Sequence, residues 1–385
     1  MLICSAFDKN ETLITPIYYK MKKQFLFLTF VVILFSCKKA SKEPLPEPKV
    51  LTQNISFKDI QNVGKILSDT EPVEIMVSRT INLRDPLSIE ASGTNRMKLS
   101  CYTLKSIKNV DVFVKLTGYE ERIKLLKIDS IASLTSFDLP VSITEKDEKL
   151  YTESGKLIEV KKQTDLSKAV FSVAVDDPFY KKLNGIKTAW QLNFRKQQQD
   201  IDNWYRMNPL HARECIAMFT NLAYLFSQDA AQKAFMDYEG LIENNGSVLT
   251  KERKEAVYKD ILTRPKIETG LVRNVSGLGG GNLVAGAEYV LMRHYNKSSE
   301  EEILHELGHA LGFSHSSNMT YPANNKAFFL AMRPIINGLL TGHEYPYWDY
   351  RLLNTYNTYI DKTGDYLREG KNPDGSRHNA TRYDY

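Results

Sequence analysis

Three of the seven histidines in this 385-residue chain lie in one run of eleven residues, HELGHALGFSH, which ends at His315. His305 and His309 are four residues apart, so they share one face of an α-helix, and Glu306 lies one position round from His305. Gly312 is expected to end the helix, because glycine adopts a left-handed backbone conformation without a Cβ penalty. The run therefore predicts a helix, a glycine turn and a short return that brings the third imidazole to the other two.

Three imidazoles aimed at one point predict a metal site that holds one Zn²⁺ per chain, with His305, His309 and His315 as its ligands. Three neutral imidazoles leave the fourth tetrahedral position open for water, which is typical of a catalytic site rather than a closed structural one. A closed site would more often use cysteine pairs, and none lie near this run. The alternative interpretation is an ordinary amphipathic helix that ends in glycine.

A glycine-rich segment precedes the histidine run. Residues Gly277–Asn282 read GLGGGN, and residues 283–295 read LVAGAEYVLMRHY. This pattern predicts a tight glycine loop followed by a strand, and a plain turn is an equally good interpretation of the glycines. A phosphate-binding G-x-G-x-x-G loop is excluded, because such a loop opens a helix rather than a strand.

The histidine run matches H-E-x-x-H-x-x-G-x-x-H and so resembles the zinc site of the metzincin peptidases, in particular zinc metalloproteinase lipoproteins of Bacteroidetes-type bacteria. The resemblance implies that Glu306 is the general base and that the three histidines are the zinc ligands. It also implies an edge strand upstream of the zinc helix that pairs with extended substrate backbone. The residues of this chain that resemble that strand are Gly279, Gly280, Gly281 and Asn282.

Two residues after the run extend the resemblance. Met319 resembles the methionine of the Met-turn, which lies beneath the metal, and Tyr321 resembles the zinc-associated tyrosine that stands two residues later in astacins and serralysins. If this role carries over, the Tyr321 hydroxyl would donate a hydrogen bond to the oxyanion; a packed loop aromatic is the alternative. Only residues 316–318 separate His315 from Met319, fewer than in most metzincins.

The resemblance implies a zinc-dependent endopeptidase that hydrolyses peptide bonds of proteins with a metal-activated water and Glu306 as general base. The alternative from another class is a catalytically silent binding lipoprotein of metzincin fold, an adhesin for a glycan or a protein. Glu306 separates the two, because a decayed site would be expected to lose the base or a ligand, and all four residues are intact. A zinc amidase or deacetylase acting on cell-wall material ranks last, since those enzymes seldom use this pattern.

The N-terminal residues 1–36 predict a leader that contains a lipoprotein signal peptide. Met21 is the expected true start, because two lysines follow it and Phe25–Ser36 is an apolar run too short for an ordinary spanning helix. Cys37 ends a lipobox-like sequence and is the expected lipidation site, and residues 37–50 continue as a proline- and lysine-containing tether. A lipid-anchored protein of the bacterial cell envelope is expected, not a cytoplasmic one; a one-piece membrane anchor is the alternative.

The remaining chain predicts an α+β fold with two domains. Residues 51–175 show period-two patterns, as in Val73–Val77, Val110–Leu116 and Leu157–Val160, and predict an all-β, sandwich-like domain. Residues 176–385 predict a metzincin-like catalytic domain.

Helical patterns appear within the second of these segments. A long helix is expected to begin near Pro209, with Cys215, Phe219 and Phe226 on one face, and another is expected over residues 251–263, where Pro265 stops it.

Charge and cysteine content limit the partners and the covalent chemistry. The net charge of +5 is mild, and no basic cluster is interleaved with aromatic residues, so we expect no nucleic-acid partner. The expected partners are a protein or peptide substrate and, through the N-terminal lipid, a membrane. Cys101 and Cys215 are expected to be separate buried thiols, with a disulfide between them as the alternative.

Overall fold

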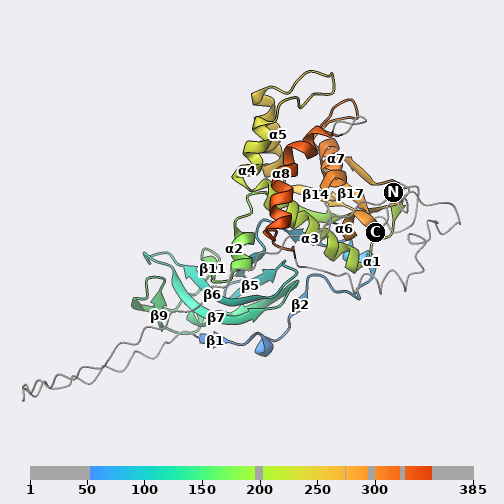
Figure 1. The fold of residues 1–385 in the computed structure, drawn as a ribbon. Coiled ribbons are helices and arrows are strands. Elements are labelled where there is room, and N and C mark those ends of the chain that lie inside the picture. The colour runs from blue at the N-terminus through green and yellow to red at the C-terminus, as the bar shows by residue number, and fades with distance from the viewer. Residues whose placement is uncertain (1–52, 196–202, 274, 294–299, 321–325, 349–385) are drawn as a thin grey trace, which may run out of the picture. The chain divides into compact units, whose positions relative to one another are not determined.

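The computed structural model describes residues 53–195, 203–273, 275–293, 300–320 and 326–348. These residues form a mixed structure of three β-sheets and several helices (Figure 1). The expected α+β class is therefore confirmed at this general level. The predicted leader, Met21, Cys37, the tether and Tyr321 lie outside the described residues.

A six-stranded sheet is built from the N-terminal half of the chain. Its order is β10-β9-β7-β6-β11, and β1 pairs with β7 in parallel. Val110, Val112 and Val114 of β6 are buried at every second position, as a period-two pattern requires, and Phe113 beside a register shift is buried as well. The strands are β1 (Gln53–Ile55), β6 (Ile107–Lys115), β7 (Ile123–Ile131), β9 (Glu148–Thr152), β10 (Leu157–Val160) and β11 (Val170–Val175).

A four-stranded antiparallel sheet shares a hydrophobic core with the six-stranded sheet. Its order is β2-β8-β5-β4, with β2 (Gly64–Lys65), β4 (Leu87–Ser92), β5 (Arg96–Cys101) and β8 (Thr135–Pro140). Leu99 and Phe137 of this sheet belong to one cluster of buried side chains with Val112 and Ile128 of the other. Two short 3-10 helices, η1 (Phe57–Asp59) and η2 (Ser142–Thr144), lie along the same part of the chain.

A seven-stranded sheet contains the glycine-rich segment. Its order is β13-β15-β17-β14-β12-β3, and β16 pairs with β17. Strands β12, β14 and β17 are parallel, whereas β3, β13 and β16 run antiparallel to their neighbours. The strands are β3 (Thr80–Asn82), β12 (Gln191–Phe194), β13 (Trp204–Tyr205), β14 (Lys266–Thr269), β15 (Leu271–Val272), β16 (Gly277–Gly280) and β17 (Leu283–Ala287).

Helices pack with this sheet around a second hydrophobic cluster, which includes Phe219 of α3, Leu304 of α7 and Val284 of β17. Helix α7 lies against β16 and β17, as Figure 1 shows near the label β17. The helices are α1 (Val73–Met76), α2 (Pro178–Asn184), α3 (Pro209–Phe226), α4 (Asp229–Asp237), α5 (Lys251–Thr263), α6 (Glu288–Arg293), α7 (Glu300–Ala310) and α8 (Ala327–Thr341). Within the described part of the chain, none of these helices combines the length and apolarity needed to cross a membrane.

Several predicted elements are confirmed. Helix α3 begins at Pro209, where the Asn208 side chain caps it, and α5 covers the predicted residues 251–263, capped by Thr250. Strand β10 also agrees with the pattern over Leu157–Val160, and it pairs antiparallel with β9 across a turn in which Gly155 has a φ of +85°. Cys101 and Cys215 are free and buried, as expected for separate thiols.

The strand predicted over Val73–Val77 is wrong, because these residues form the short helix α1. Five residues with alternating polarity fit a helical face as well as a strand. Met76 and Val77 are buried together in the core, whereas the Ile75 side chain, which a strand would bury, is 45% exposed.

The strand predicted over residues 283–295 is only partly correct. Strand β17 ends at Ala287, and α6 follows directly from Glu288. The preceding glycines are not a loop, because Gly277–Gly280 form β16, paired antiparallel with β17.

The predicted division at residue 175 stays a prediction. Strand β3 precedes this position in the sequence but pairs with β12 of the seven-stranded sheet. Leu67, Met76 and Leu134 also belong to the hydrophobic cluster of that sheet. Segments from both sides of the predicted boundary therefore contribute to one core.

Candidate metal centre

Helix α7 carries two of the three histidines, and its C-terminal turn directs the chain towards the third. The helix ends at Ala310, and Gly312 has a φ of +89°. The amide of Phe313 donates to the carbonyl of Gly308, and the amide of Gly312 donates to that of His309. These two bonds form a Schellman motif, for which glycine in the left-handed region is the usual residue. The predicted glycine turn is thus confirmed.

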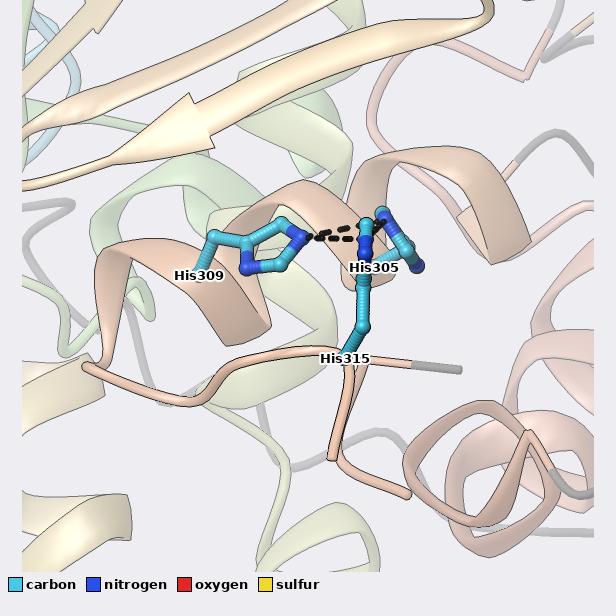
Figure 2. A group of neighbouring side chains, drawn as sticks. All are labelled: His305, His309 and His315. Atoms are coloured by element: carbon cyan, nitrogen blue, oxygen red, sulfur yellow. Dashed lines mark hydrogen bonds between the residues drawn. The ribbon is translucent and has the colours of Figure 1, made fainter. Parts of the chain in front are cut away.

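The three imidazoles meet at their Nε2 atoms. His305 and His309 project from α7, and His315 reaches them from the loop that follows the helix (Figure 2). The Nε2 atom of His309 lies 3.2 Å from that of His305 and 3.1 Å from that of His315, and the third separation is 3.4 Å. Among the described residues, these three form the group whose donor atoms could hold a metal ion.

This triangle fits a tetrahedral ion of the size of zinc. Two imidazole nitrogens about 2.0–2.1 Å from one tetrahedral Zn²⁺ would lie about 3.3–3.4 Å apart. The tautomer of His309 also fits, because its Nδ1 lies 2.8 Å from the carbonyl oxygen of Phe313 and donates to it. The neutral ring then carries its lone pair on Nε2, where it faces the other two imidazoles.

The surroundings keep the histidines on α7 neutral. Burial, and after it the neighbouring imidazoles of His309 and His315, lower the pKa of His305 to about 4. Burial also lowers the pKa of His309. Both rings are therefore neutral at neutral pH, each with one N–H and one lone pair, which is the form that binds a metal.

Glu306 lies beside the three imidazoles and is almost fully buried. One of its carboxylate oxygens, Oε1, is 3.8 Å from Nε2 of His305. Burial raises the pKa of Glu306 to about 8. A cation held by the three histidines would act against this rise, because a nearby positive charge favours the carboxylate.

Two glycines of β16 allow the strand to lie directly on α7 at Glu306. A Cβ atom on Gly277 would be 2.4 Å from the Glu306 Oε1, and one on Gly279 would be 2.3 Å from the Glu306 backbone oxygen. A larger residue at Gly279 would force the strand and the helix apart, whereas one at Gly277 would displace the Glu306 side chain. These two glycines therefore permit a close approach of β16 to the helix.

A pocket of about 680 Å³ opens beside the histidines. Residues 275–279, the first turn of α7, the histidines and Lys326 line it. Lys326 forms an ion pair with Glu301 at the rim. The pocket is large enough for several side chains of an extended peptide, and its rim carries one positive and one negative side chain.

The strand predicted at Gly279–Asn282 is present for Gly279 and Gly280 and absent for Gly281 and Asn282, and its role as an edge for substrate stays a prediction. Within the described residues, β16 is paired only with β17, so its other edge faces away from the sheet. Gly281, with a φ of +59°, and Asn282 form the turn between these strands. The turn follows from the left-handed conformation that Gly281 adopts.

Met319 is brought next to α7, and its side chain is fully buried. Its backbone carbonyl lies against Gly308, the residue before His309, where a Cβ atom would be 2.5 Å from the oxygen. This contact is compatible with the short spacing after His315, and assignment to a Met-turn stays a prediction.

Arg264 is a residue near the site that the sequence did not reveal. This buried side chain donates to the carbonyl of Ala310 at 2.9 Å and to that of Gly281 at 2.6 Å, and it pairs with Asp260 at 2.7 Å. It therefore joins the last turn of α7 to the β16–β17 turn. The only local signal was an arginine at the C-cap of α5, which does not reveal these distant acceptors.

Arg264→Ala should lower the free energy of unfolding by about 1–3 kcal/mol, because it leaves the buried carbonyl group of Ala310 without this donor and removes the hydrogen bond to Gly281. Arg264→Lys should restore only part of this loss, since an ammonium group cannot match the fork of the guanidinium. The exposed Arg84 offers the control, because Arg84→Ala should change the free energy of unfolding by less than about 0.5 kcal/mol. Denaturant unfolding measures the stability of all three variants. Equal unfolding free energies for Arg264→Ala and Arg84→Ala would contradict this supporting role of Arg264.

Comparisons of this chain with protein-family models, with curated proteins and with solved structures find no match.

Proposed function

We propose that this chain is a zinc-dependent endopeptidase of metzincin type. The observation that carries the proposal is the triangle of Nε2 atoms from His305, His309 and His315, with separations that suit one tetrahedral ion, next to the carboxylate of Glu306. The pocket beside them and the free edge of β16 give room for an extended peptide. A purely binding protein would have no need of a buried carboxylate at this point.

In the proposed reaction, zinc bound by the three histidines would polarise the peptide carbonyl and make water acidic near neutral pH. Glu306 accepts the proton of the attacking water on its carboxylate and then donates it to the leaving amine. The Glu306 side chain packs against β16 at Gly277, where a Cβ atom would leave no room for it. Tyr321, as the resemblance implies, donates a hydrogen bond to the oxyanion.

The proposal includes a substrate mode. Within β16, alternate residues, Gly279 among them, direct their backbone groups to the edge that β17 does not use, and an extended peptide can pair with such an edge. The same proposal assigns residues 176–385 to a metzincin-like catalytic domain and residues 51–175 to a sandwich-like β domain. The shared core of the four- and six-stranded sheets supports the second assignment.

The proposed cellular setting rests on the sequence. Lipidation at Cys37 would anchor the chain in a membrane of the bacterial cell envelope, with residues 37–50 as the tether. Its substrates would then be proteins or peptides that reach that membrane.

The test is a measurement of metal and activity on the purified chain. We expect close to one zinc per chain, cleavage of a proteome-derived peptide library, loss of both on chelation, and recovery of both on adding zinc back. A chain without zinc would contradict the metal site. A zinc-loaded chain that cleaves no peptide would instead favour the binding lipoprotein.

A further inference from the structure

The loop that carries His315 is hydrogen-bonded to a segment about seventy residues earlier in the chain, Gly240–Asn244, called here the 240–244 segment. His315 is the one ligand of the three that does not lie on α7. We propose that the 240–244 segment, through Asn244, positions His315 for the metal. This inference rests on the proposed zinc site and makes Asn244 a positioning residue rather than a catalytic one.

Asn244 holds the residues just before His315. Its Oδ1 accepts hydrogen bonds from the amide of Ser314 at 2.7 Å and from the hydroxyl of Ser314 at 3.1 Å. Its Nδ2 donates to the carbonyl of Gly312 at 3.1 Å. One side chain therefore fixes the backbone on both sides of Phe313, in the short return from the end of α7 to His315.

Asn318 and Ser317 hold the residues just after His315. The buried Asn318 accepts from the amide of Ile242 at 2.9 Å and donates to the carbonyl of Gly240 at 2.7 Å. The Ser317 hydroxyl donates to the carbonyl of Ile242 at 2.6 Å. The loop is thus tied to the 240–244 segment both before and after the histidine.

The 240–244 segment is itself held in a hairpin. Ile242 pairs with Val248, and the amide of Glu243 donates to the carbonyl of Ser247 at 2.7 Å. Arg253 pairs with Glu243 at 2.8 Å and lies over the ring of Phe313 at 5.3 Å. The support for the loop is therefore a structured element.

The physical consequence is preorganisation of an exposed ligand. A loop that had to become ordered when the metal binds would lose conformational freedom at that step, and this loss would weaken binding. Groups that orient metal ligands from the next layer typically contribute about 10- to 100-fold in metal affinity. Three hydrogen bonds from Asn244 place it in that class.

Asn245 offers a matched control one residue away. It is also exposed, and its Oδ1 accepts hydrogen bonds from the amide and hydroxyl of Ser247 within its own turn. A general effect of altering the hairpin would therefore appear in Asn245→Ala as well. Of these two asparagines, Asn244 is the one whose side chain hydrogen-bonds to the loop of His315 in the described part of the chain.

The experiment compares zinc affinity and hydrogen exchange in the full chain and its Asn244→Ala, Asn244→Asp and Asn245→Ala variants. Zinc affinity is measured by competition with a chelating indicator, and exchange over residues 312–318 is measured in the metal-free protein. We expect Asn244→Ala to lose about 10- to 100-fold in zinc affinity and to speed exchange of the Ser314 amide. Asn244→Asp keeps the acceptor for that amide, so it should recover part of the zinc affinity and part of the protection from exchange. Asn245→Ala should match the wild type in both measurements.

Two failures are distinguishable. Equal zinc affinities of Asn244→Ala and Asn245→Ala, in a wild-type chain that binds zinc, would overturn this inference and leave the proposed zinc site standing. A wild-type chain that binds no zinc would overturn the proposed function, and the positioning role with it, whatever the exchange shows.

Discussion

A Glu306→Gln variant should keep its fold and one zinc per chain and lose at least about 100-fold in kcat for peptide hydrolysis. Glutamine has nearly the shape of glutamate, so the contact with Gly277 stays and β16 keeps its place on α7. The amide can hydrogen-bond to water but cannot accept its proton. The loss should therefore appear in kcat with zinc content unchanged, as measured by peptide cleavage and metal analysis on one preparation.

Two other variants make this result specific. His309→Ala removes a donor atom of the triangle and the hydrogen bond to Phe313, so zinc and activity should fall together. Glu255→Gln makes the same chemical change at an exposed position on α5 and should leave both unchanged. If Glu306→Gln turned over peptide at the wild-type rate, Glu306 would not be the base.

Local patterns in the sequence predicted the parts of the site that are close along the chain. The four-residue spacing of His305 and His309 fixes a shared helical face, and Gly312 marks the turn that returns His315. The helices at Pro209 and over residues 251–263 were equally readable, because capping residues and apolar spacing lie within the helices themselves or beside them.

The strand β16 could not be predicted from its own residues. Glycine has a low propensity for strands, and GLGG reads as a loop. Pairing with β17 and contact with α7 at Glu306 make it a strand, and both depend on residues elsewhere in the chain. The same limit applies to Val73–Val77, where a five-residue pattern fits either element until the core is known.

The supports of the site were beyond the reach of sequence patterns for the same reason. Arg264 reaches Ala310 across 46 positions, and Asn244 reaches Ser314 across 70. Nothing near either residue indicates its partner. Motif spacing therefore identified the three histidines whose Nε2 atoms meet, whereas the residues that hold them in place emerged only from the fold.

The contact between α7 and the residues after His315 leads to a second large effect, at Gly308. Alanine in place of glycine within a helix normally stabilises a protein by up to about 1 kcal/mol. At Gly308 the added Cβ would lie 2.5 Å from the backbone oxygen of Met319 and 3.1 Å from Cγ2 of Thr320. Backbone atoms cannot turn aside as a flexible side chain can, so the helix and the Met319 segment must separate.

We expect Gly308→Ala to lower the free energy of unfolding by about 1–3 kcal/mol, the usual cost of overpacking. The separation also moves His309 relative to His315, and a displacement of about 1 Å can cost about 100-fold in kcat/KM. Gly338→Ala on α8 is the control, because its Cβ would meet nothing within 4 Å and the ordinary gain in helix stability should appear. Denaturant unfolding should thus show a loss of stability in Gly308→Ala and a gain in Gly338→Ala. Peptide cleavage should fall in Gly308→Ala. A Gly308→Ala chain as stable and as active as the wild type would mean that α7 and Met319 are not packed this closely.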